Sequence, residues 1–213
     1  MNPRPKKLRL LRWLPKRLML TERPMGGRGL YLTFDDGPHP AVTPGVLDVL
    51  AEHGVKATFF LLGANVERYP EIARRIVAEG HAIGNHSYSH PRFARIDLSA
   101  QREEIDRTDR ILAGFDGRVR HWFRPPSGAL PWRMLGYFAR RRRGIAYWSY
   151  DSMDYRREGA EVLARRLREQ PPVAGDIVLM HDDDPSTLLV LRELVPEWRA
   201  AGHAMEALPL EPG

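Results

Sequence analysis

The 213-residue sequence contains no cysteine, which excludes disulfides, thiolate metal sites and cysteine nucleophiles. No stretch approaches the roughly 20 consecutive apolar residues that a membrane-spanning helix needs. A glycine-rich dinucleotide-binding motif, internal repeats and low-complexity tracts are also missing. The composition, 43% hydrophobic and 28% charged residues, is that of an ordinary globular protein, and the chain is long enough for one large domain with a substantial core.

Acidic residues are scarce at the start of the chain. Residues 1–28 hold nine Lys/Arg and one acid, Glu22, so this arm carries +8 and residues 29–213 carry −2. Charges interrupt every apolar run in "KKLRLLRWLPKRLML", so no cleavable signal peptide is evident. Either the leucines pack on the domain while the cations stay solvated, or the arm makes peripheral contact with an anionic membrane surface, although Pro15 breaks the amphipathic pattern. We expect a cytoplasmic protein, peripheral to the inner face of the membrane if the arm binds lipid.

From residue 29 onward, short apolar runs alternate with longer helical patterns. Strands are predicted at 30–34, 57–62, 81–85, 121–123, 145–149, 176–180 and 204–208. Helices are predicted near 44–53, 67–79, 99–114, 131–143, 159–169 and 187–201, with Gly54, Gly80, Gly144 and Gly202 just beyond four helix ends. This alternation predicts an α/β fold with a parallel sheet. About seven such units favour a single domain over 29–213, an irregular (β/α) barrel with its site at the carboxyl ends of the strands.

Unusual polar groups follow several of these strands. "GLYLTFDDGPHP" ends a buried strand with adjacent carboxylates, Asp35 and Asp36. His86 and His90 are four residues apart, which is ligand spacing on a helical turn. Joined to a strand-end aspartate, they would form a two-His, one-carboxylate site suited to catalytic zinc or non-haem iron. Arginine, carboxylate and imidazole groups follow three further strands and are costly to place there without partners: Arg124, Asp151 and His181.

Five motifs occur in one order: "TFDDGP" (33–38), "HSYSH" (86–90), "RPPSG" (124–128), "DSMDY" (151–155) and "IVLMH" (177–181). In these motifs the chain resembles the polysaccharide deacetylase family, carbohydrate esterase family 4, whose domain is also called the NodB-homology domain. The resemblance covers about residues 29–208. The compact layout is similar to that of the rhizobial chitooligosaccharide deacetylases.

The resemblance implies a divalent metal held by Asp36, His86 and His90, with Zn²⁺ as the first expectation and Co²⁺, Ni²⁺ or Mn²⁺ as alternatives. It makes Asp35 the general base that deprotonates the metal-bound water. Arg124 is the expected partner that keeps this carboxylate ionised and oriented.

The resemblance also implies that the Ser127 N–H stabilises the oxyanion, that Leu179 lines the acetyl pocket, and that His181 protonates the leaving amine. Asp151 is expected to orient and charge that imidazole, whereas Asp154 either hydrogen-bonds within its loop or assists the site. Ser127 replaces an aromatic residue and Tyr155 a tryptophan of the family pattern. We expect these two departures to affect substrate choice.

The implied function is a metal-dependent hydrolase that removes N-acetyl groups from a GlcNAc-containing, chitooligosaccharide-like glycan. The alternatives are an O-acetyl (xylan-type) esterase, a peptidoglycan or exopolysaccharide deacetylase, and a non-catalytic glycan-binding member of the family. A monomer is expected. Nucleic acid is not an expected partner because the domain beyond the arm is net acidic.

Overall fold

The computed structural model describes residues 3–6, 8–22, 29–129 and 131–210. Its centre is the strand β2, Gly29–Asp35, which is buried over most of its length. The order of the central sheet is β4-β3-β2-β7-β6, and every pairing in it is parallel. The other four strands of this order are β3 (Thr58–Leu61), β4 (Ala82–Asn85), β6 (Tyr150–Asp151) and β7 (Ile177–His181).

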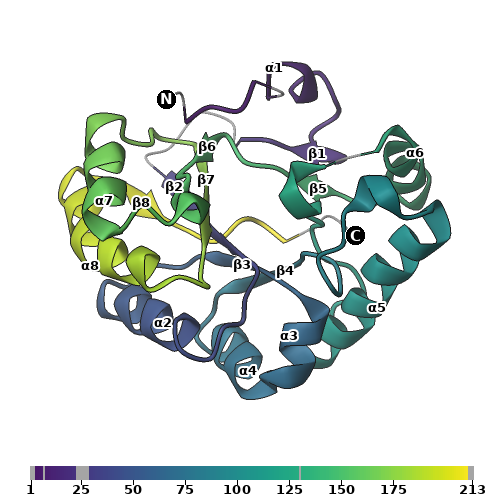
Figure 1. Ribbon diagram of the computed structural model, residues 1–213, viewed down its shortest axis with the longest axis horizontal. Helices are drawn as coiled ribbons and strands as arrows, with labels where there is room; N and C mark the ends of the chain where they lie inside the picture. Colours follow the sequence, from purple (N-terminus) through teal and green to yellow (C-terminus); the bar gives the residue numbers. More distant parts are fainter. Residues whose placement is uncertain (1–2, 7, 23–28, 130, 211–213) are drawn as a thin grey trace.

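The sheet continues beyond β4 through single bridges. Phe123 bridges Asn85 on one side and Ile145 on the other. Ile145 opens β5 (Ile145–Ala146), which pairs in parallel with β1 (Met19–Leu20). β8 (Ala204–Met205) lies outside this order and pairs with the start of β2. The strands thus curve around a common interior (Figure 1), and the predicted irregular parallel (β/α) barrel is confirmed.

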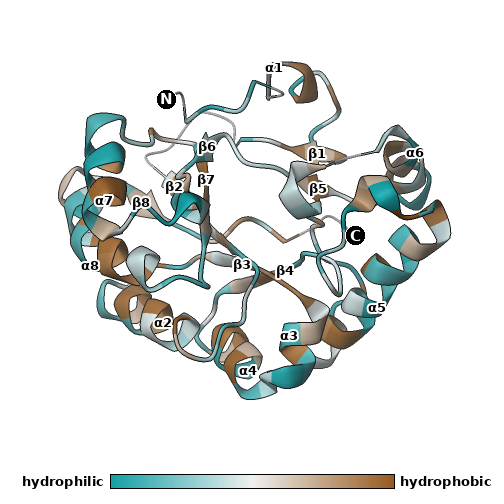
Figure 2. Cartoon of the chain, in the orientation of Figure 1, coloured by the Kyte–Doolittle hydropathy of each residue, from teal (hydrophilic) through white to brown (hydrophobic). Residues whose placement is uncertain are grey.

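Helices surround the strands (Figure 1) and turn apolar residues inward and polar residues outward (Figure 2). They are α1 (Leu8–Leu11), α2 (Thr43–Glu52), α3 (Gly63–Arg68), α4 (Pro70–Ala78), α5 (Leu98–Asp116), α6 (Trp132–Arg141), α7 (Ala160–Glu169) and α8 (Pro185–Ala200). Three single 3₁₀ turns lie at Phe93–Arg95, Pro126–Gly128 and Asp154–Arg156. Among the described residues, no helix has the length and apolar character to cross a membrane.

Two buried clusters form the core. One packs β2, β3 and β7 against α2, α4, α7 and α8. The other fills the barrel beneath α6 and includes Met19 and Leu20 of the arm. Leu11, Leu14 and Leu18 pack against it, partly buried. These leucines of the arm therefore rest on the domain, whereas Leu10 is exposed. The boundary predicted at residue 28 stays a prediction.

Several predicted elements differ from the structure. The segment 121–123 contributes only the bridge at Phe123. Of the strand predicted at 145–149 only β5 forms, and β6 follows at Tyr150–Asp151. The helix predicted at 67–79 becomes α3 and α4, because Pro70 lacks the N–H that a continuous helix requires. Gly54, Gly80 and Gly202 have the positive φ expected after a helix.

Gly144 was predicted to lie just beyond a helix end, but the structure gives it a different role. The left-handed residue that ends α6 is Arg142, not Gly144. A Cβ at position 144 would lie 2.0 Å from the Trp122 ring. The glycine is therefore required by close packing against Trp122 rather than by backbone conformation.

Pro3 and Arg4 of the arm contact the barrel at β6 and at the start of β7. The Asp151 N–H donates to the Pro3 carbonyl at 2.8 Å. Arg4 donates two hydrogen bonds to Asp176, which lies directly before β7. The arm thus runs across the barrel from β6 and β7 to β5 (Figure 1).

Candidate active site

The adjacent carboxylates diverge because the chain turns between them. Asp35 ends β2 and lies opposite His181 in the register with β7. Asp36 has a φ of 74°, outside the strand conformation. A Cβ at Gly37 would lie 2.5 Å from an oxygen of Asp182, so only glycine permits this turn beside a buried carboxylate. The two aspartates therefore serve different neighbours.

Asp36 faces two imidazoles. Its Oδ1 lies 3.4 Å from Nε2 of His86 and 3.6 Å from Nε2 of His90. One ligand atom from each of the three residues lies within 4.8 Å of the others. The Asp36 Oδ1 is buried and has no hydrogen-bond partner in the described part of the chain. A buried carboxylate oxygen without a partner is costly, and a divalent cation between these three groups would satisfy it.

His86 is prepared as a neutral ligand. Its Nδ1 lies 2.8 Å from the carbonyl of Arg124, to which it donates in the tautomer that leaves the Nε2 lone pair toward Asp36. Burial lowers the pKa of His86 to about 3. Metal ligation requires an unprotonated imidazole, so the residues present fit a divalent metal.

The segment between the two histidines is a loop and not the predicted helical turn. Ser87 and His90 have positive φ, which a helix does not allow. The Asn85 side chain accepts from the Ser87 N–H and donates to Asp109. Glu104 of α5 accepts from the N–H groups of residues 88 and 89. These contacts bring the imidazoles together with ring centroids 5.2 Å apart.

Asp35 is paired with Arg124, as predicted. Oδ1 accepts from Nη1 of the arginine at 2.8 Å, and both residues are buried. The other oxygen, Oδ2, lies 3.7 Å from Nε2 of His86 and so faces the candidate metal ligands. Burial raises the pKa of Asp35 more than the charge of Arg124 lowers it. A carboxylate with a raised pKa is a stronger base.

His181 is paired with Asp154, and the prediction that Asp151 orients it is wrong. Nδ1 of His181 lies 2.8 Å from Oδ1 of Asp154, whose Oδ2 accepts from the His181 N–H. Burial alone would lower the pKa of His181, but the hydrogen bond and charge of Asp154 raise it to about 10. Asp151 instead accepts from the Met153 N–H and the Trp148 indole. It ends β6 beside Leu179 of β7.

Of the predicted substrate-binding residues, Tyr155 lies beside this centre. Tyr155 is 56% exposed, and its ring meets that of His181 edge-on at 6.0 Å. Both line a cavity of about 200 Å³ together with Asp36. Leu179 is buried. Ser127 has an exposed side chain and a φ of 53°, and its N–H meets no acceptor in the described residues.

Comparison with known proteins identifies the family that has this fold and these motifs. A family model described as "Polysaccharide deacetylase" matches residues 22–140. The chain belongs to the polysaccharide deacetylase family. A chitooligosaccharide deacetylase of Azorhizobium caulinodans is 36% identical over 196 residues, 84% of this chain and 92% of that protein. A peptidoglycan-N-acetylglucosamine deacetylase of Bacillus cereus is 34% identical over 201 residues, 92% of this chain and 73% of that protein.

A solved structure agrees with this deacetylase fold. The crystal structure of a peptidoglycan N-acetylglucosamine deacetylase in complex with 4-naphthalen-1-yl-N-oxidanyl-benzamide superposes with a TM-score of 0.85. Its sequence identity to this chain is 32%, and the match covers 92% of this chain and 96% of that chain. The resemblance seen in the five motifs is thereby confirmed, and so is the assignment of this deacetylase as an enzyme acting on N-acetyl amides.

Sequence reasoning missed two supporting residues of the deacetylase site, Asn85 and Glu104. Asn85 had a usable signal, because a polar residue that ends a buried strand directly before the histidine motif is unusual. Glu104 gave no signal, since it lies in the middle of an amphipathic helix pattern. Asp182 is fully buried next to Gly37, and Thr43 donates to it. Burial raises the pKa of Asp182 to about 7.

Proposed function

We propose that this chain is a metal-dependent hydrolase that removes N-acetyl groups from a GlcNAc-containing, chitooligosaccharide-like glycan. One observation carries the proposal. A carboxylate held by an arginine, Asp35, and an imidazole held by a carboxylate, His181, lie opposite each other in the strand register, beside the cluster Asp36, His86 and His90. Amide hydrolysis needs such a base and such an acid on either side of one carbonyl.

Asp36, His86 and His90 would hold the divalent ion, which when bound supplies Lewis-acid polarisation of the acetyl carbonyl and a more acidic water. Asp35 takes the proton of the attacking water. Its Oδ2 faces the cluster while its Oδ1 is fixed by Arg124, so the accepting oxygen is oriented before the substrate arrives.

The leaving amine requires a proton, and His181 holds one. Asp154 raises the pKa of His181 to about 10, so the imidazole is protonated at neutral pH. An alcohol leaves from an ester with much less need for protonation. A strongly charged imidazole therefore favours amide substrates over the O-acetyl esters of xylan.

The Ser127 N–H is the proposed donor to the oxyanion. It follows two prolines in a 3₁₀ turn, and its left-handed backbone leaves the N–H without an acceptor in the described residues. A main-chain donor fixed before reaction costs no reorganisation when charge develops. Because the donor is main-chain, serine can occupy this position without loss of that hydrogen bond.

The decisive experiment measures acetate release by the purified protein from chitooligosaccharides, peptidoglycan fragments and acetylxylan, with and without added Zn²⁺. We expect zinc-dependent release from the two N-acetylated glycans and less from acetylxylan. The names of the two relatives support both N-acetylated substrates. Faster release from acetylxylan would favour the esterase alternative, and no release from any glycan would favour a binding protein.

Removing the carboxylate of the ligand cluster should remove the metal. In Asp36→Ala the two imidazoles keep their positions, because the contacts of Asn85 and Glu104 do not involve Asp36, but the charged ligand is lost. We expect zinc content to fall from near one equivalent to near zero, and acetate release to fall with it. Elemental analysis after dialysis measures the first, and Asp48→Ala, which removes an exposed carboxylate of α2, is the control. A fully loaded Asp36→Ala protein would contradict the assigned ligand set.

A further inference from the structure

The charges of this chain are separated along the sequence. Residues 1–28 hold nine Lys/Arg and one acid, and residues 117–150 hold eight Arg and no acid. Together the two segments carry +16. The rest of the chain, with sixteen Lys/Arg and twenty-six Asp/Glu, carries −10. The net charge of +6 therefore conceals two strongly opposed regions.

The fold brings the two basic segments together. β1 of the arm pairs with β5 through Met19–Ile145 and Leu20–Ala146. The Ile145 N–H donates to the Leu18 carbonyl at 2.9 Å. Leu11, Leu14 and Leu18 of the arm and Leu135 of α6 pack against the same core cluster. We call the surface formed by residues 10–18 and 132–142 the arm–α6 face.

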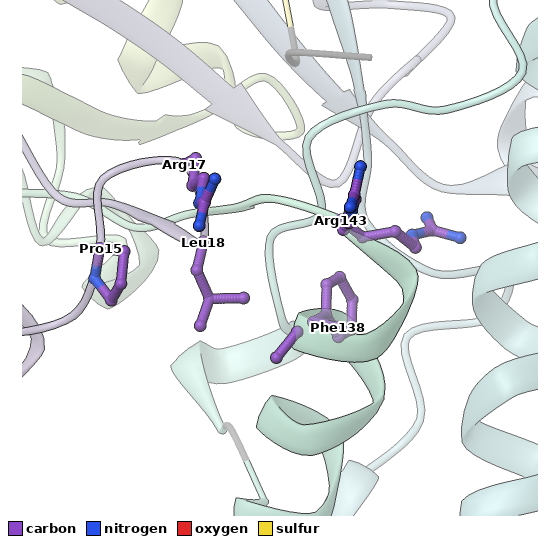
Figure 3. A pocket seen from close by; sticks show the side chains of 7 residues that line it. Pro15, Arg17, Leu18, Phe138 and Arg143 are labelled. Carbon is purple, nitrogen blue, oxygen red and sulfur yellow. The ribbon is translucent and has the colours of Figure 1, made fainter.

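One part of the arm–α6 face is cationic. A cavity of about 490 Å³ lies between the arm and the end of α6, with Pro15, Arg17 and Leu18 on one side and Phe138 and Arg143 on the other (Figure 3). Ala139 and Arg142 complete its lining, which contains no acid. Within the described residues, six exposed cations of this face form no ion pair with an acid: Lys16, Arg17, Arg133, Arg140, Arg141 and Arg142.

The other part is apolar and exposed. Trp13 is 88% exposed, Trp132 is 79% exposed and Leu10 is 65% exposed. They line a groove of about 470 Å³ that also includes Leu14 and Gly128. Large apolar side chains held in water at one place, next to unpaired arginines, indicate a surface that is covered by a partner. Tryptophan with flanking cations is the composition that proteins use at the boundary between lipid and water.

We propose that the arm–α6 face binds the surface of an anionic phospholipid bilayer. The indoles of Trp13 and Trp132 enter the headgroup region, while Arg17, Arg133 and their neighbours lie against lipid phosphates. Charge complementarity selects an anionic over a neutral surface. The apolar groove selects a bilayer over a nucleic acid, which would leave the groove uncovered. We therefore also propose that the protein lies at the periphery of a membrane, the location expected if the arm binds lipid. This proposal rests on the arm–α6 face and is independent of the deacetylase chemistry.

The test is binding to vesicles followed by co-sedimentation and by tryptophan emission. We expect binding to phosphatidylcholine vesicles containing about 30% phosphatidylglycerol, none to pure phosphatidylcholine, and release at about 0.5 M NaCl. The chain has five tryptophans. Trp122, Trp148 and Trp198 are buried, so a blue shift of the emission on binding reports Trp13 and Trp132.

Two double variants separate the charged and apolar contributions. Lys16→Gln with Arg17→Gln should weaken binding by about tenfold or more, and Trp13→Ala with Trp132→Ala should weaken it similarly and remove the blue shift. The matched controls lie on α7, on α8 and in the loop before β7. They are Arg165→Gln with Arg192→Gln, which removes two exposed cations, and Val173→Ala with Leu189→Ala, which removes two exposed apolar side chains. Both controls should bind as the unaltered protein does, and thermal unfolding verifies that every variant is folded.

Other outcomes overturn the proposal. Equal binding to neutral and anionic vesicles, or no binding to either, removes the role of charge complementarity. An equal loss in the control that removes Arg165 and Arg192 shows that net charge, and not this face, is responsible. Binding that depends on Lys16 and Arg17 but not on the tryptophans indicates a general polyanion surface rather than a bilayer. Acetate release from soluble glycans is measured separately, so a failure here is distinguishable from a failure of the proposed deacetylase function.

Discussion

Asp35→Asn should lower acetate release by on the order of a thousandfold, because general base catalysis contributes factors of this size. The amide is close in shape to the carboxylate and its oxygen can still accept from Arg124, but it cannot take the proton of water. The metal ligands Asp36, His86 and His90 are unchanged, so zinc content should stay near that of the unaltered enzyme. Elemental analysis and acetate release on one preparation measure both quantities.

The substitution also removes the charge partner of a buried guanidinium. Breaking a buried ion pair can cost about 3–5 kcal/mol of the free energy of unfolding, so urea unfolding must show that the Asp35→Asn protein is folded under assay conditions. Asp48→Asn, at an exposed carboxylate of α2, is the matched control and should keep its rate. A folded, zinc-loaded Asp35→Asn enzyme with a near-normal rate would remove Asp35 as the base.

Asp154→Asn should move the alkaline limb of the pH–rate profile to lower pH by about 1–3 units. His181 acts in its protonated form, so activity is lost as the pH rises through its pKa. Asp154 raises that pKa to about 10 against the effect of burial, which lowers it. Without this carboxylate the imidazole loses its proton at lower pH. The dependence of kcat/KM on pH, measured with an N-acetylated oligosaccharide, reports the shift.

Asp151→Asn is the matched control within the same motif. Its carboxylate contacts the Met153 N–H and the Trp148 indole rather than the imidazole, so the alkaline limb should move much less. An acetyl ester with an activated leaving group should be less sensitive to Asp154→Asn than the amide. If Asp151→Asn shifts the limb and Asp154→Asn does not, the pairing seen in the structure is not the one used in catalysis.

The contrast between these two aspartates shows where sequence reasoning ends. The gathering of Asp35, His86, Arg124 and His181 at one end of the barrel could be predicted, because the carboxyl ends of parallel strands meet at the same edge. The choice between Asp151 and Asp154 could not. Met153 has a φ of 61°, and this left-handed residue turns the chain into a 3₁₀ turn that buries Asp154 against His181.

The arm was hard to predict for a related reason. β1 has two residues and lies in a segment dominated by lysine and arginine, so it has no periodic pattern of its own. Its strand conformation comes from its partner, β5, which is equally short. By contrast, β2 and β7 were predicted to within one residue at each end, because their apolar runs are buried on both faces of the sheet.

Anyone who prepares this protein in the laboratory will be tempted to treat residues 1–28 as a dispensable tail. Pro3 accepts a hydrogen bond from the backbone of Asp151, and Arg4 is bound to Asp176 at the start of the strand that ends in His181. Trimming the chain at residue 28 would therefore remove the strand that pairs with β5 and the contacts of Pro3 and Arg4 beside β6 and β7. It would also expose the core that Met19 and Leu20 cover. An affinity tag is better placed at the carboxyl terminus, and a shortened version that precipitates would say nothing about the chemistry of the site.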